Sequence, residues 1–256
     1  MQELANRIAN LNESATIKMA QMTRELKSQG RDIIDLSLGE PDFETPEHIK
    51  AAAKKAIDDG FTHYTPVAGY LDVRQAISEK FLKENDLHYA PEQIVISTGA
   101  KQSIINAVMC LVNPGDEVIL PTPFWVSYSA MVKLAEGVIV EIPTSVESDF
   151  KISPAQLEAA ITPKTKLIMF SSPCNPTGTV YTREELKVIL SKPELSNDLK
   201  SLLYRNLART YLFQETFTSE ELAELLSAII KSKMFQNPIS IFIFFFMQQQ
   251  FIIQVQ

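Results

Sequence analysis

Three short stretches of the chain combine residue types that could bind one ligand. Thr98-Gly99-Ala100-Lys101 joins a glycine to one lysine at an expected helix start, a pattern that favours an anion site. Trp125 follows the proline-stiffened turn Pro121-Thr122-Pro123 and could offer its flat face to an aromatic ring. Asn175 stands between Pro173 and Pro176 and would hold a short amide in a rigid loop. A ligand that matches all three stretches has a phosphate, a flat ring and an oxygen on that ring, as pyridoxal 5′-phosphate has.

Each stretch also has a simpler interpretation. Many strand-to-helix turns contain a glycine, a lone tryptophan can pack in a core, and a proline-rich loop can merely reverse the chain. Their positions favour the ligand site, because each stretch follows an expected strand, over 94–97, 117–120 and 166–170. In an open α/β sheet such loops lie at the carboxyl ends of the strands, where ligands bind.

The elements expected around these loops alternate between strands and helices. Thr182 and Glu185 form a capping box, so a helix begins after the Asn175 loop. The first 190 residues predict an α/β sheet with crossover connections. The other expected elements are a helical arm over 1–28, strands over 32–37 and 138–142, and helices over 46–59, 70–84, 100–112, 124–135 and 154–160.

Composition and charge exclude several classes of protein. The formal net charge of −7 argues against a nucleic-acid partner, which needs a basic surface. The two cysteines, Cys110 and Cys174, stand in no CxxC or Cys/His cluster, so we expect neither a disulfide framework nor a metal site. The N-terminus has no uninterrupted apolar segment and no stretch reaches bilayer length, so we expect a cytoplasmic protein without a membrane partner.

The composition changes after Gly178. All 8 glycines lie at or before that residue, so the rest of the chain lacks the usual residue for positive-φ turns. We therefore expect a divergent helical and apolar tail over 191–256. Its apolar run Ile239–Met247 predicts poor solubility and a sheet edge left open to other molecules.

Five ordered motifs resemble the class I/II aminotransferases, and most closely the bacterial type of aspartate aminotransferase. The resemblance covers about residues 1–190 and implies a pyridoxal-phosphate-dependent transferase fold of type I. It divides the chain into an N-terminal arm with part of a small domain over 1–38, a partial cofactor-binding large domain over 39–190, and the tail. The motifs are SLGEPDF (37–43), HYTPVAGYLDVRQAI (63–77), STGAKQ (97–102), PGDEVILPTPFWVSY (114–128) and SSPCNPTGTVY (171–181).

The resemblance implies a role for each matching residue. Gly99, Ala100 and Lys101 would hold the cofactor phosphate, and Trp125 would stack on the pyridine ring and line the substrate site. Asn175 would bond the phenolic oxygen of the ring and lie near the substrate carboxylate. The backbone amide of Gly39 would bind that carboxylate. Tyr64 would reach the phosphate of a neighbouring subunit, which implies a homodimer. The implied substrates are an L-amino acid, aspartate above all, and a 2-oxo acid such as 2-oxoglutarate.

The chain departs from the family pattern beyond the Asn175 loop. The family's Asp-x-x-Tyr motif is not met, because Asp198 is the only aspartate downstream and Ser201 stands three residues later. Lys233, in Ser-Lys-Met-Phe, is the candidate for the lysine that links to the cofactor, although it also fits the exposed face of a helix. No arginine follows Arg209. Two interpretations stay open: a truncated aminotransferase or mispredicted gene product, or a non-catalytic protein that binds the cofactor or dimerises.

Overall fold

The computed structural model describes residues 5–11, 14–36, 39, 43–85, 87–190 and 250–254. Their contacts divide the chain into two compact units, one from residues 1–12 and 71–256 and one from residues 13–70. This division does not follow the sequence-derived boundary between residues 38 and 39, and the family domain limits stay a prediction. The Gly99, Trp125 and Asn175 loops all lie in the larger of the two units.

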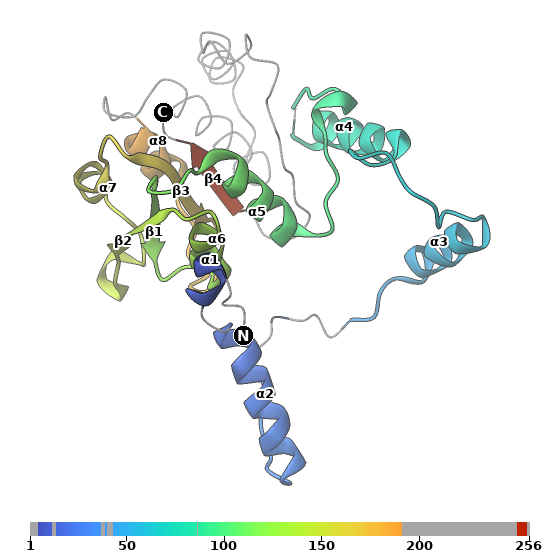
Figure 1. Cartoon of the computed structure of the whole chain (residues 1–256), viewed down its shortest axis with the longest axis horizontal. Helices are drawn as coiled ribbons and strands as arrows, with labels where there is room; N and C mark the ends of the chain where they lie inside the picture. The colour runs from blue at the N-terminus through green and yellow to red at the C-terminus, as the bar shows by residue number, and fades with distance from the viewer. Residues whose placement is uncertain are drawn as a thin grey trace. The chain divides into compact units, whose positions relative to one another are not determined.

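A four-stranded sheet in the order β2-β1-β3-β4 forms the centre of the larger unit (Figure 1). Strand β1 (Glu117–Thr122) pairs in parallel with β2 (Val138–Pro143) and with β3 (Thr165–Ser171). Strand β4 (Gln250–Gln254) pairs antiparallel with β3. The prediction of an α/β architecture with crossover connections is confirmed.

Alternation along the strands explains why both faces of the sheet are covered, since successive side chains point to opposite faces. Val118 and Leu120 pack with α5 (Ala100–Leu111) and α6 (Ser127–Leu134). Ile119, between them, packs on the other face with α7 (Pro154–Ala160) and α8 (Arg183–Leu190). Strand β3 repeats the pattern, with Leu167 and Met169 on the first face and Ile168 on the second. The sheet therefore lies between two helical layers.

The remaining helices agree with the expected segments. The N-terminal arm consists of α1 (Asn6–Ala9) in the larger unit and α2 (Ala15–Ser28) in the smaller one. Helix α3 (Glu47–Asp58) begins after Pro46, and α4 (Leu71–Asn85) precedes the short 3₁₀ helix η1 (Pro91–Gln93), which contacts it. A second 3₁₀ helix, η2 (Val146–Ser148), follows β2. No described helix has the length and apolarity needed to cross a membrane.

Two expected strands do not form among the described residues. Residues 31–36 adopt no regular structure, and over 94–97 only Ile94 makes a bridge. The side chains of Ile34 and Leu36 are exposed, at 86% and 89%. Both segments have strand-like composition, but a strand is stabilised by cross-strand pairs and neither segment borders β1, β2, β3 or β4.

The expected open edge beside β3 is corrected by the pairing with β4. Residues Leu167–Ser171 of β3 face Gln250–Gln254 in an antiparallel register. The backbone groups of β3 that pair with β4 no longer offer a template to another molecule, and β4 becomes the edge strand on that side. The apolar run Ile239–Met247, on which that expectation rested, lies outside the described residues.

Candidate functional site

The loop after β1 places Trp125 at the carboxyl end of a buried strand. Trp125 is half-buried, and its carbonyl accepts a bond of 2.9 Å from the backbone N–H of Tyr128 at the start of α6. The rings of Trp125 and Tyr128 meet edge to face, with centroids 5.6 Å apart and planes at 83°. Such a contact fixes the plane of the indole, so that Trp125 can act as a flat platform.

The N-terminus of α5 brings a cation to that platform. The Nζ of Lys101 lies 5.2 Å from the centroid of the Trp125 ring, within the range of a cation–π contact. Gly99 precedes the helix with φ 83°, and nothing lies within 4 Å of the position that a Cβ would take there. No side chain caps the helix at Gly99, and a helix N-terminus without a cap suits an anion. Ala100 is the first residue of the helix.

The loop after β3 holds Asn175 in a closed turn. The backbone N–H of Asn175 donates to Oγ of Ser171 over 3.1 Å. The N–H of Cys174 donates to the carbonyl of Thr179 over 2.8 Å, and the N–H of Gly178 donates to the carbonyl of Cys174 over 2.7 Å. These bonds fix the backbone of the turn, and Asn175 is half-buried in it.

A further contact joins the turn to the platform loop. The thiol of Cys174 lies 3.6 Å from the carbonyl oxygen of Pro123, two residues before Trp125. The structure therefore brings Lys101, Trp125 and the Asn175 turn together through one chain of contacts. Sequence reasoning named these residues but not Tyr128 or Ser171. Their spacing, three residues after Trp125 and four before Asn175, is too common in sequences to single them out.

The other predicted site residues are not brought to this place by the described contacts. Gly39 and Tyr64 belong to the smaller unit, where the side chain of Tyr64 is fully exposed. Lys233 and Asp198 lie outside the described residues. Among the described residues, no group of three or more histidine, cysteine, aspartate or glutamate side chains could hold a metal ion.

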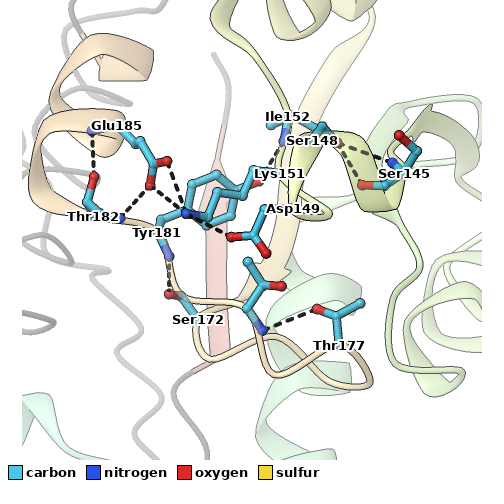
Figure 2. Close-up of polar contacts among 11 residues, drawn as sticks. Ser145, Ser148, Asp149, Lys151, Ile152, Ser172, Thr177, Tyr181, Thr182 and Glu185 are labelled. Atoms are coloured by element: carbon cyan, nitrogen blue, oxygen red, sulfur yellow. Dashed lines mark hydrogen bonds and ion pairs between the residues drawn. The ribbon is translucent and has the colours of Figure 1, made fainter.

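A network of hydrogen bonds joins the Asn175 turn to the segment before α7 (Figure 2). Oγ of Ser172 accepts a bond of 3.1 Å from the N–H of Tyr181, and the Tyr181 hydroxyl accepts a bond of 2.9 Å from the N–H of Ile152. Burial raises the pKa of Tyr181 to about 12, against the opposing effect of the Ile152 bond. The phenol therefore stays neutral and ties the turn to the segment before α7.

The predicted capping box at the start of α8 is confirmed. Glu185 accepts a bond of 2.6 Å from the N–H of Thr182, and Oγ1 of Thr182 accepts one of 3.3 Å from the N–H of Glu185. Glu185 also pairs with Nζ of Lys151 over 3.0 Å, and Asp149 lies 3.3 Å from the same ammonium (Figure 2). Although burial acts to raise the pKa of Glu185, the bonds from Thr182 and Lys151 outweigh it and lower that pKa.

Replacing Glu185 with glutamine is expected to remove a small, pH-dependent contribution to stability. Glutamine still caps the helix but cannot pair with Lys151, so about 0.5–1 kcal/mol is lost at pH 7. A carboxyl whose pKa is lowered in the fold stabilises above its unfolded pKa and stops doing so as the pH falls through the folded value. Urea unfolding should therefore separate Glu185→Gln from the parent at pH 7 but not at pH 3. Glu184→Gln, at an exposed neighbour, is the control; equal losses in the two variants would contradict the prediction.

Comparisons with known proteins identify the family of the chain. The family model for aminotransferase class I and II matches residues 31–197. An aspartate/prephenate aminotransferase of Cereibacter sphaeroides is 50% identical over 196 residues, which are 75% of this chain and 49% of that protein. An aspartate aminotransferase of Geobacillus stearothermophilus is 46% identical over 187 residues, 73% of this chain and 48% of that protein.

Solved structures agree with these relatives. The aspartate aminotransferase of Thermus thermophilus solved with maleate matches with a TM-score of 0.70 and 44% identity, covering 74% of this chain and 50% of that chain. The chain thus spans about half the length of the relatives it matches. The predicted aspartate-aminotransferase-like fold of type I is confirmed over this part. The chain belongs to the class I and II aminotransferase family.

Proposed function

We propose that the larger unit carries the cofactor-binding face of a pyridoxal-phosphate-dependent aminotransferase. The observation that carries the proposal is the ammonium of Lys101 over the Trp125 ring, beside the turn that holds Asn175. An anion-binding group, an aromatic platform and an amide meet at the carboxyl ends of parallel strands, where α/β proteins bind ligands. The proposed reaction moves an amino group from an L-amino acid such as aspartate to a 2-oxo acid such as 2-oxoglutarate.

The residues present fit pyridoxal 5′-phosphate. The open space at Gly99 and the uncapped amides of α5 suit the phosphate, together with the exposed ammonium of Lys101. The long stem of Lys101 lets the ammonium leave the indole for the phosphate while Trp125 takes the ring. The Asn175 amide suits the phenolic oxygen. When bound, the cofactor supplies an electron sink that makes the substrate Cα–H acidic. The protein's part is to bind and orient it.

The remaining parts of the proposal come from the family. The Gly39 amide would bind the substrate carboxylate and Tyr64 the phosphate of a second subunit in a homodimer. Residues 1–38 would belong to the arm and small domain, residues 39–190 to the large domain, and residues 191–256 to a tail unlike the family. We propose a cytoplasmic location for the protein, and Lys233 as its candidate for the covalent link to the cofactor.

A second candidate function is a non-catalytic module that binds the cofactor or phosphate, or that dimerises. The sequence after Asn175 favours it, because that stretch contains neither the Asp-x-x-Tyr pattern nor an arginine after Arg209. Such a module would keep the phosphate and ring contacts and lack the groups that move protons and hold the substrate carboxylate.

Binding of pyridoxal 5′-phosphate tests the proposal directly, because Trp125 is the only tryptophan. Titration of the full chain is expected to quench its fluorescence to saturation. An unquenched Trp125 in folded protein would contradict a cofactor site. Borohydride reduction and peptide mapping then separate the two candidates: label on Lys233 favours the enzyme, whereas reversible binding without label and without turnover of aspartate and 2-oxoglutarate favours the module.

A further inference from the structure

Tyr128 is a buried residue in direct contact with the Trp125 platform. It lies in the first turn of α6, three residues after Trp125, and only 1% of it is exposed. Its ring sets the indole edge to face, as described above. Since the cofactor ring would stack on Trp125, any residue that fixes the plane of Trp125 also affects the cofactor.

The Tyr128 hydroxyl has no hydrogen-bond partner among the described residues. A buried hydroxyl without a partner is costly, so the few that occur in native proteins call for an explanation. Burial raises the pKa of Tyr128 well above its ordinary value, so the phenol stays neutral and remains a donor.

Two groups at the end of β3 and in the Asn175 turn act on this hydroxyl. Besides burial, the Ser171 hydroxyl acts to lower the pKa of Tyr128 and Cys174 acts to raise it. The Tyr128 hydroxyl nevertheless makes no hydrogen bond to Ser171 or to another described residue. Oγ of Ser171 already accepts one hydrogen bond, from the backbone N–H of Asn175.

We propose that Tyr128 is a positioning residue for the cofactor, whose ring fixes Trp125 and whose hydroxyl bonds Ser171 once the cofactor is seated. The bond would link the Trp125 platform to the Asn175 turn, because Tyr128 contacts Trp125 and Ser171 binds the backbone of Asn175. The inference rests on the proposed function, because it requires one cofactor ring that contacts both Trp125 and Asn175.

A double-mutant cycle on pyridoxal 5′-phosphate binding tests the inference, with Trp125 fluorescence of the full chain as the readout. Tyr128→Phe keeps the ring and removes only the hydroxyl. We expect the dissociation constant to rise about threefold to tenfold in Tyr128→Phe, the range for one hydrogen bond. Ser171→Ala should show a similar rise, and the double variant no further rise. Tyr89→Phe, whose ring packs edge to face on Phe81 of α4, is the control for binding.

Stability separates positioning from a merely structural role. The Tyr128 hydroxyl has no bond to lose in the free protein, so the urea midpoint of Tyr128→Phe should equal or exceed that of the parent. Tyr181→Phe is the contrast, because its hydroxyl accepts from the Ile152 amide, and its midpoint should fall.

Three outcomes would overturn the inference. Unchanged affinity in Tyr128→Phe would show that the hydroxyl does not serve binding. Additive losses in the cycle would show that Tyr128 and Ser171 are not coupled. A midpoint as low as that of Tyr181→Phe would show a hydroxyl already bonded in the free protein. Absence of quenching in the parent would instead remove the proposed function together with the inference.

Discussion

Leu167→Ala is expected to lower the free energy of unfolding by about 3–5 kcal/mol, the range for a leucine deleted from a packed core. Leu167 is 0% exposed and lies on β3, which has a neighbouring strand on each side. Its side chain faces α5 and α6 and packs with Val118 and Val108. Because helices cover this face, the site cannot collapse easily around the missing atoms, so the cavity cost adds to the transfer cost.

Urea unfolding followed by circular dichroism measures this effect. Leu82→Ala, on α4, is the matched control, because Leu82 is 47% exposed and alanine favours a helix. We expect its midpoint to stay within about 0.5 kcal/mol of the parent. If the two variants lost equal stability, the β3 face would not be the core of the larger unit.

Hydrophobic periodicity predicted the parts of the fold in which neighbouring elements bury a face. The apolar runs at 117–120 and 166–170 became β1 and β3, and α7 has the predicted bounds 154–160. The same composition failed at 32–37 and 94–97, because sequence preference specifies an extended backbone but not a pairing partner. The pairing of β3 with β4 could not be predicted for a similar reason: register and partner depend on tertiary contacts between distant segments.

Sequence analysis could name the site residues whose type alone suggests a contact with a ligand. Lys101, Trp125 and Asn175 stand in loops after expected strands, and the Nζ of Lys101 lies over the Trp125 ring. Their roles toward a cofactor stay a prediction. Tyr128 and Ser171 were missed because a tyrosine in a helix and a serine at a strand end are common core and turn residues. Only the unpaired hydroxyl and the bond to the Asn175 amide distinguish them, and both are facts of three-dimensional placement.

Lys101→Gln is expected to weaken binding of pyridoxal 5′-phosphate about tenfold to hundredfold. Glutamine keeps part of the stem near Trp125 but removes the charge, and a hydrogen bond to a charged group contributes about 1.5–3 kcal/mol, with each 1.4 kcal/mol worth a factor of ten. Quenching of Trp125, the only tryptophan, gives the dissociation constant.

The choice of control decides whether a loss in Lys101→Gln reports a site or only net charge. Lys187→Gln removes the same charge from an exposed position on α8 and should bind like the parent. If Lys101 pairs with the cofactor phosphate, added salt should weaken cofactor binding by screening that charge pair. The affinity of Lys101→Gln should therefore depend less on salt than that of the parent. Equal weakening in the two variants would assign the effect to the overall field of the protein. Unchanged affinity in Lys101→Gln would leave the phosphate to the amides of α5 and would limit Lys101 to its contact with the Trp125 ring.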